Sequence, residues 1–164
     1  MTRDVPVQPL HTDAFQAYGH VLNLGASDTR AINAGTSQRL DLTGSLTLHA
    51  EGGEPVLAVF RARAQAPEGP WHLLERHRLG SQTFVPLAGA RCVVLVALGR
   101  DGPDLATLAA FRVAGDQGIT LHPGTWHHPL LALDDGDFLV IERAGRAVDC
   151  DVVQLDTPVR LRLD

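Results

Sequence analysis

Two short segments of the chain concentrate the side-chain types that transfer protons or bind metal ions. The first runs Glu75-Arg76-His77-Arg78-Leu79-Gly80-Ser81-Gln82, and the second runs His122-Pro123-Gly124-Thr125-Trp126-His127-His128-Pro129. Histidine exchanges protons near neutral pH and is a common metal ligand. Oxygen and nitrogen ligands together suit Ni²⁺, Mn²⁺ or Fe²⁺. We therefore expect the functional site to be built from these two segments.

The first segment has the pattern of a strand that ends at a turn. Successive strand residues point to opposite sides, so Glu75 and His77 share one side and Arg76 takes the other. A turn at Leu79-Gly80 returns the chain antiparallel and directs Gln82 to the same place as Glu75 and His77. A Glu-x-His pair taken alone is more often part of a solvated face than of a site, so the hypothesis depends on the second segment.

The second segment presents a histidine at the start of a strand. Pro123-Gly124 forms a tight turn that places His127 at this position, and His128 then faces the opposite side. We expect a structural role for His128. Trp126 is expected in the core or at the wall of the substrate pocket, where a large aromatic side chain excludes water.

The elements that position these residues are predicted to be short strands. Many β-branched segments, broken by Gly, Pro and Asp and not alternating with helices, predict an all-β antiparallel barrel of jelly-roll type in one domain, residues 1–164. One short helix near the N-terminus is capped by Thr12 or Asp13 and ends at Gly19. The predicted strands cover 46–49, 55–61, 71–77, 83–87, 91–98, 108–113, 119–122, 128–133, 137–142 and 150–155.

Composition restricts the class of protein and its cofactors. The 164 residues carry a net charge of −5, and the 14 basic residues are all arginines. Without lysine, a pyridoxal phosphate Schiff base and a P-loop nucleotide site are excluded, and the acidic balance argues against a nucleic-acid surface. The longest apolar stretch, 92–99, is too short to cross a membrane. Because Arg3 and Asp4 interrupt any signal peptide, we expect a cytoplasmic protein.

Both segments resemble the motifs of the cupin family. Glu-x-His-x4-Gln-x6-Gly, from Glu75 to Gly89, is similar to the first cupin motif, and His122-x-Gly124-x-x-His127 is similar to the second. Glu75 takes the place of the usual first histidine, and Gln82 takes the place of the usual glutamate. The resemblance implies a cupin-like barrel and a divalent metal such as Ni²⁺ or Mn²⁺, held weakly because one ligand is a neutral amide. The implied ligands are Glu75, His77, Gln82 and His127.

Further motifs, spread over residues 7–155, resemble the ureidoglycolate lyase family. They include Phe15-x-x-Tyr18-Gly19, Ile32-Asn33-x-Gly35 with Arg39, Leu74-Glu75-Arg76-His77, Leu79-Gly80-Ser81-Gln82, Trp126-His127-His128-Pro129-Leu130 and Cys150-Asp151-Val152. The resemblance implies a homodimeric enzyme that cleaves (S)-ureidoglycolate to glyoxylate and urea in allantoin breakdown. Nickel or another divalent ion is implied as its cofactor.

This reaction needs a base for the substrate hydroxyl, a proton for the leaving urea nitrogen and a cation for the carboxylate. We expect Glu75, His77 and His127 to be the catalytic residues. The candidates for binding the substrate are Arg61, Arg63, Asn33, Arg39 and Trp126, of which Asn33 and Arg39 would act across a dimer interface. Three alternatives stay open: a ureidoglycolate hydrolase-type reaction, another small hydroxy-acid enzyme, and a non-catalytic cupin sensor of a small acid.

Overall fold

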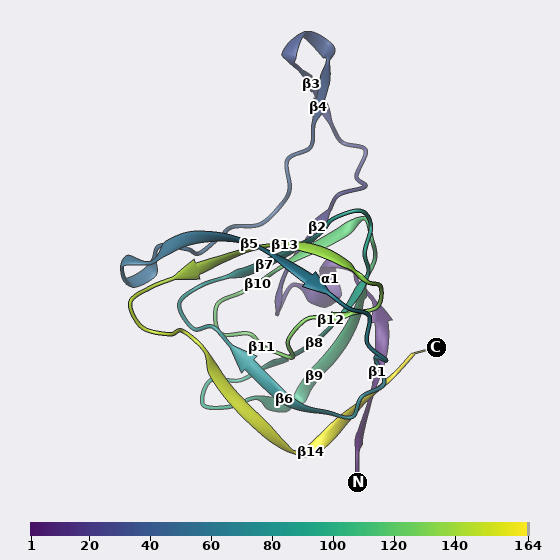
Figure 1. The fold of residues 1–164 in the computed structure, drawn as a ribbon, viewed down its shortest axis with the longest axis vertical. Helices are drawn as coiled ribbons and strands as arrows, with labels where there is room; N and C mark the ends of the chain where they lie inside the picture. Colours follow the sequence, from purple (N-terminus) through teal and green to yellow (C-terminus); the bar gives the residue numbers. More distant parts are fainter. Residues whose placement is uncertain (164) are drawn as a thin grey trace.

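Strands form most of residues 1–163, the part of the chain that the computed structural model describes (Figure 1). They are β1 (Arg3–Pro9), β2 (Gly19–Asn23), β3 (Arg30–Ile32), β4 (Ser37–Arg39), β5 (Glu54–Ala62), β6 (Trp71–Arg76), β7 (Gln82–Pro86), β8 (Cys92–Leu98), β9 (Asp104–Val113), β10 (Gln117–Leu121), β11 (Trp126–His127), β12 (Leu131–Ala132), β13 (Gly136–Ala144) and β14 (Asp151–Arg162). The helical elements are α1 (Thr12–Phe15) and the 3-10 turns η1 (Asn33–Gly35) and η2 (Ala50–Gly52). The all-β prediction with one short N-terminal helix is confirmed.

Six strands close into a barrel. Their order is β11-β6-β14-β1-β9-β8, and a further pairing between β8 and β11 completes the circle. The barrel is mixed, not purely antiparallel as predicted, because β1 lies parallel to both β14 and β9. The sequence pattern did not indicate β1, since Pro6 and Pro9 interrupt it and proline is unfavourable within strands.

A second sheet, in the order β2-β10-β7-β13-β5, packs against the barrel. Alternate residues of β8 serve the two cores that result: Val93 and Leu95 belong to a cluster formed within the barrel strands, and Val94 and Val96 belong to a cluster shared with the second sheet. The continuous apolar sequence of β8 is therefore explained by burial on both of its faces.

Some predicted boundaries were wrong. Residues 46–49 are irregular, and residues 128–133 contain only the short strand β12, after β11 has ended at His127. The strand β2 was missed, although its residues Val21 and Leu22 are buried. None of the helical elements in the described part of the chain is long and apolar enough to span a bilayer.

Strands β3 and β4 form a hairpin that projects away from the rest of the molecule (Figure 1). Its residues are exposed or partly exposed, and η1 forms its tip. The hairpin carries Asn33 and Arg39, and Arg39 pairs with Asp41 at 2.6 Å. These two predicted site residues therefore lie outside the body that contains the other candidates.

Candidate functional site

Three predicted site residues meet at the end of strand β6. His127 of β11 lies opposite Glu75 of β6 in the strand register, and the His127 Nε2 atom is 3.5 Å from Glu75 Oε1. His77 follows β6 directly, and its ring lies 5.4 Å from the His127 ring. One ligand atom from each of the three side chains lies within 4.8 Å of the others. The structure thus brings Glu75, His77 and His127 together, and we call these three residues the triad cluster.

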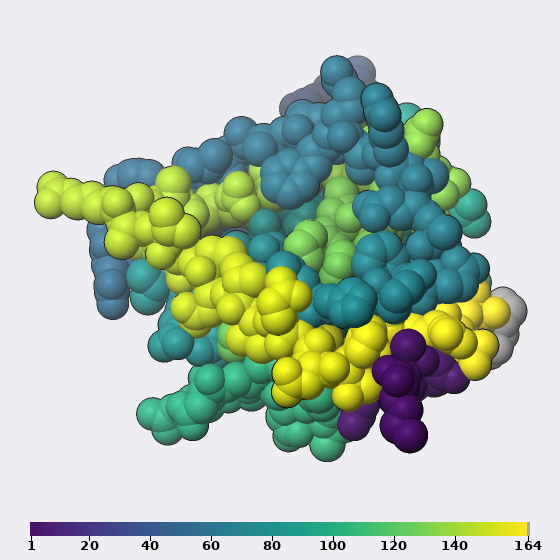
Figure 2. Space-filling model, turned by 60° about the horizontal axis from the view of Figure 1, so that its bottom comes forward, coloured from purple at the N-terminus to yellow at the C-terminus, as the bar shows by residue number. Residues whose placement is uncertain are grey.

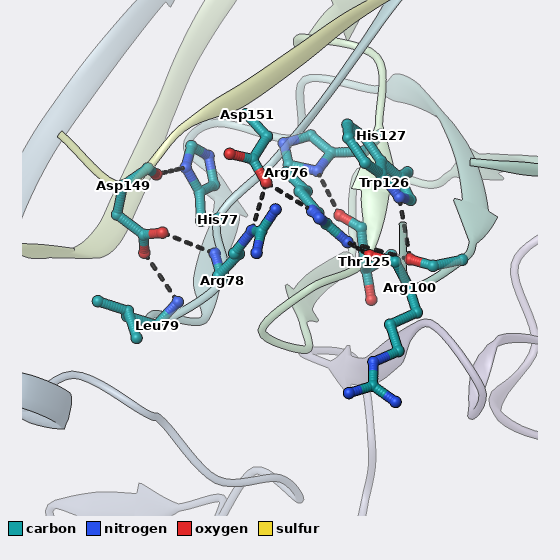
Figure 3. A network of polar contacts seen from close by, with 11 residues as sticks. Arg76, His77, Arg78, Leu79, Arg100, Thr125, Trp126, His127, Asp149 and Asp151 are labelled. Atoms are coloured by element: carbon teal, nitrogen blue, oxygen red, sulfur yellow. Dashed lines mark hydrogen bonds and ion pairs between the residues drawn. The ribbon is translucent and has the colours of Figure 1, made fainter. Parts of the chain in front are cut away.

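Backbone carbonyls fix the orientation of both histidines. His77 Nδ1 donates to the Asp149 carbonyl at 2.7 Å, and His127 Nδ1 donates to the Thr125 carbonyl at 3.0 Å (Figure 3). A carbonyl only accepts hydrogen bonds, so in each neutral ring the proton is on Nδ1 and the Nε2 lone pair is free. Both Nε2 atoms are buried, and neither has a hydrogen-bond partner within the described residues.

Gln82 at the start of β7 is fixed in a similar way. Its Nε2 donates to Glu142 Oε2 at 2.9 Å, and its Oε1 is buried without a hydrogen-bond partner in the described chain. An ionised carboxylate only accepts hydrogen bonds, so the amide group must turn its nitrogen to Glu142 and its oxygen away. Gln82, His77 and His127 therefore each hold one bare acceptor atom in the interior. Buried polar atoms without partners are rare, which points to an absent ligand.

These donors fit a divalent cation. Two imidazole nitrogens, an amide oxygen and the Glu75 carboxylate are a mixed nitrogen and oxygen set of the kind that Ni²⁺, Mn²⁺ and Fe²⁺ accept. The hydrogen bonds from each Nδ1 are also typical of metal-ligating histidines, because they direct the Nε2 lone pair.

Glu75 is ionised in this environment. The close approach of the His127 ring lowers the pKa of Glu75 below its usual value, and partial burial opposes this only in part. Cys150 Sγ lies 3.8 Å from Glu75 Oε2. Burial and the charge of Glu75 raise the pKa of the Cys150 thiol, so this cysteine is a neutral neighbour of the carboxylate and not a thiolate.

Arg76 lies on the opposite side of β6 from Glu75 and His77, as the strand alternation predicts. It is only 4% exposed; its Nε donates to Asp151 at 2.8 Å, and its Nη1 donates to the carbonyls of Gly99 and Arg100 (Figure 3). Its guanidinium lies over the ring of Trp126 at 4.4 Å. This arrangement anchors the back of the strand that carries the cluster.

Of the two positions expected for Trp126, the core and the wall of the substrate pocket, the structure shows the core. Trp126 is 1% exposed, packs in the cluster of the barrel strands and donates from Nε1 to the Gly99 carbonyl. It precedes His127 on a strand, so its side chain takes the other side of β11 from the His127 ring. Its position beneath Arg76 gives it a structural role.

The structure does not bring the predicted substrate arginines to the triad cluster within one chain. Arg61 pairs with Asp137 at 3.0 Å in an exposed position, and Arg63 lies just beyond the same end of β5. Arg61 is therefore far from the candidate ligand Gln82. Its partner Asp137 lies five residues along β13 from Glu142, the partner of Gln82, and five strand residues span about 17 Å. Strand alternation could place the two arginines on one face, but it could not tell which end of the strand they would occupy.

A cavity of about 310 Å³ opens beside the cluster. His77, Glu142 and Cys150 line it together with the segment 143–149. Two arginines that the sequence pattern did not single out, Arg143 and Arg146, also line it. A small carboxylate entering this cavity would meet these two arginines beside His77.

His128, for which we expected a structural role, is half-buried. Its ring lies 4.7 Å from the Trp71 ring, and its Nδ1 is 2.7 Å from the Pro129 carbonyl. Burial lowers the pKa of His128, so the ring is neutral at neutral pH. Its contacts are those of a packed side chain.

Comparison with known proteins agrees with the motifs. A family model described as "Ureidoglycolate lyase" matches residues 2–162. A protein named ureidoglycolate lyase from Pseudomonas putida is 37% identical over 150 residues, covering 91% of this chain and 90% of its own. Proteins with the same name from Pseudomonas syringae pv. tomato and Stutzerimonas stutzeri are 35% and 36% identical, each over 99% of this chain and 96% of its own.

Proposed function

Because this chain belongs to the ureidoglycolate lyase family, we propose that it cleaves (S)-ureidoglycolate to glyoxylate and urea. The observation that carries the proposal is the triad cluster, in which two histidines and an ionised glutamate converge beside a cavity of small-molecule size. These are side chains that can move protons near neutral pH.

The reaction is chemically simple. The substrate carries a hydroxyl group and a urea nitrogen on the same carbon atom. Removal of the hydroxyl proton forms the aldehyde carbonyl of glyoxylate and breaks the carbon–nitrogen bond, and the leaving urea nitrogen takes up a proton. The enzyme therefore needs one group that accepts a proton and one that returns it.

Glu75 and His127 are placed to share this work. The Glu75 carboxylate is ionised and lies 3.5 Å from His127 Nε2, so a proton taken from the substrate hydroxyl can pass between the two groups. His77 presents a second bare Nε2 to the same space and can hold the hydroxyl group by accepting its hydrogen bond. We assign the catalytic roles to Glu75, His77 and His127.

The same residues and Gln82 would hold a divalent ion. A bound ion acts as a Lewis acid that lowers the pKa of a coordinated hydroxyl group. The neutral Gln82 ligand supplies no charge, so we expect exchangeable binding of Ni²⁺ or Mn²⁺. We expect chelator treatment to lower activity, Ni²⁺ or Mn²⁺ to restore it, and Glu75→Gln to prevent this restoration. Full activity in enzyme shown by elemental analysis to be metal-free would instead assign the cluster to metal-independent proton transfer.

The products test the reaction itself. Purified protein is incubated with racemic ureidoglycolate, and glyoxylate, urea and ammonia are measured separately. A lyase releases glyoxylate and urea in equal amounts and consumes half of the racemate. Release of ammonia in place of urea would identify a hydrolase-type reaction. Tight binding of the substrate without any turnover would identify a sensor.

We also propose a homodimer. The edge of the second sheet is β5, where Leu57 and Val59 are 70% and 51% exposed. An exposed apolar edge strand favours pairing with a second chain, and the projecting β3–β4 hairpin would then carry Asn33 and Arg39 to the partner. Light scattering at micromolar concentration should give twice 17.6 kDa, and Val59→Lys should weaken the dimer. A monomeric mass for the unaltered protein would contradict the proposal.

A further inference from the structure

Asp149, in the segment that connects β13 to β14, makes hydrogen bonds to four consecutive residues of the turn after β6. We propose that Asp149 is a positioning residue, which holds the Nδ1–H tautomer of His77 and so keeps the His77 Nε2 lone pair directed at Glu75 and His127. Asp149 itself takes no part in the chemistry. For its catalytic consequence alone, the inference rests on the proposed function.

The Asp149 carboxylate holds the backbone of the turn. Oδ1 accepts the N–H of Arg78 at 2.7 Å, and Oδ2 accepts the N–H of Leu79 at 2.9 Å (Figure 3). Oδ2 also accepts the N–H of Gly80 at 3.2 Å. Hydrogen bonds that involve a charged group are roughly twice as strong as neutral ones. This turn joins His77 to the strand that begins with Gln82, so one carboxylate fixes the connection between two of the candidate ligands.

The Asp149 carbonyl holds the His77 side chain. It accepts the proton of Nδ1 at 2.7 Å, the shorter of the hydrogen bonds that the two cluster histidine rings make to backbone carbonyls. The proton position on a neutral imidazole depends on the partner of the other nitrogen. Because the Nδ1 proton is donated to the carbonyl, Nε2 of the neutral ring carries only its lone pair. This Nε2 atom has no hydrogen-bond partner in residues 1–163.

The carboxylate is needed because little else holds this carbonyl in place. Residues 144–148, which precede Asp149, are all exposed, and Val148 is 92% exposed (Figure 2). The next fixed point along the chain is Asp151, which pairs with Arg76 in the strand register. Loss of the three carboxylate hydrogen bonds would therefore release the carbonyl from His77.

Imidazole ¹⁵N NMR of the unaltered, metal-free protein gives the first test, because a protonated and a bare ring nitrogen have well-separated shifts. We expect both His77 and His127 to be Nδ1–H tautomers at a pH at which they are neutral. His77 in the Nε2–H form would overturn the inference without any variant.

Variants give the second test. We expect Asp149→Ala to shift His77 toward the Nε2–H tautomer and Asp149→Asn, which keeps one acceptor oxygen, to have an intermediate effect. His127, held by the Thr125 carbonyl, should keep its tautomer in both variants and serves as the internal reference. The control is Asp134→Asn, because Asp134 also accepts a backbone N–H, that of Arg91, but at another loop. Unchanged His77 in folded Asp149→Ala, or an equal change in the Asp134 variant, would overturn the inference.

The catalytic consequence is measured separately. Partners that orient a functional histidine are typically worth about 10- to 100-fold in activity, and we expect a loss of this size in kcat for Asp149→Ala, with a smaller loss for Asp149→Asn. A shifted tautomer with unchanged kcat would leave the structural inference standing and would count against the role of His77 in the proposed function. The two failures are therefore distinguishable.

Discussion

Glu142 should control metal affinity without touching the metal. It is the acceptor that turns the Gln82 nitrogen away from the interior and leaves the Gln82 oxygen free. In Glu142→Gln the new amide can accept or donate, so Gln82 is no longer held to one orientation. Part of the protein would then present an NH₂ group where a ligand oxygen is required, and a cation would bind more weakly.

The size of the effect follows from the hydrogen bond that is weakened. Gln82 is 5% exposed, so water does not replace the lost partner freely. A hydrogen bond to a charged group contributes about 1.5–3 kcal/mol and a neutral one about 0.5–1.5 kcal/mol, so the change is about 1–2 kcal/mol. At about 1.4 kcal/mol per tenfold change, this corresponds to roughly 5- to 30-fold weaker binding.

Isothermal titration of chelator-treated protein with Mn²⁺ or Ni²⁺ measures this directly. Glu54→Gln is the matched control, because Glu54 is an exposed glutamate on the neighbouring strand, opposite Ala144. Gln82→Leu, which removes the ligand oxygen itself, should weaken binding at least as much as Glu142→Gln. Wild-type affinity in Glu142→Gln, or an equal loss in Glu54→Gln, would refute the reasoning.

Three further outcomes are expected. His127→Ala should lower kcat/KM by about 100-fold or more, whereas His128→Ala should lower stability in urea, because its ring packs on Trp71, and leave kcat nearly unchanged; equal kinetic losses would contradict these roles. The pKa of folded Glu75 lies below its ordinary value because His127 is close to it, so its contribution to stability is present above the ordinary pKa and is lost as the pH falls through the folded pKa. Urea unfolding at about pH 6 and about pH 3 should therefore show a larger loss for wild type than for Glu75→Gln. Arg76→Met should cost about 1–3 kcal/mol of unfolding free energy, because the Gly99 and Arg100 carbonyls lose their donor, and an unchanged urea midpoint would show that the buried guanidinium is not an anchor.

Local spacing was sufficient to predict that Glu75, His77 and His127 lie close together. The strand period placed Glu75 and His77 on one side and Arg76 on the other, and the turn before His127 indicated where the second segment would enter. The residues that orient these side chains could not be predicted in this way, because they are distant in the chain. Glu142 is 60 residues from Gln82, and Asp149 is 72 residues from His77.

The fold was predictable where a strand is regular and apolar, and less so elsewhere. β8 has an uninterrupted run of apolar residues, whereas β1 contains two prolines and only two valines. Its pairing is decided by tertiary contacts with β9 and β14, so the parallel strands that make the barrel mixed were missed. The position of Arg61 could not be predicted for a related reason. The alternation of side chains indicates which face of β5 Arg61 shares with Arg63, but tertiary contacts decide where that end of β5 lies.

The place of β1 in the barrel has a consequence for how the protein reaches its native state. Residues 3–6 pair with 159–162, and residues 7–9 pair with 110–112. Contacts so distant in sequence require a large loop to close before they stabilise the chain, and such topologies fold slowly. During synthesis β1 must wait for residues 159–162 to emerge from the ribosome before the barrel can close. Until then its edges are open, so the nascent chain is exposed to aggregation.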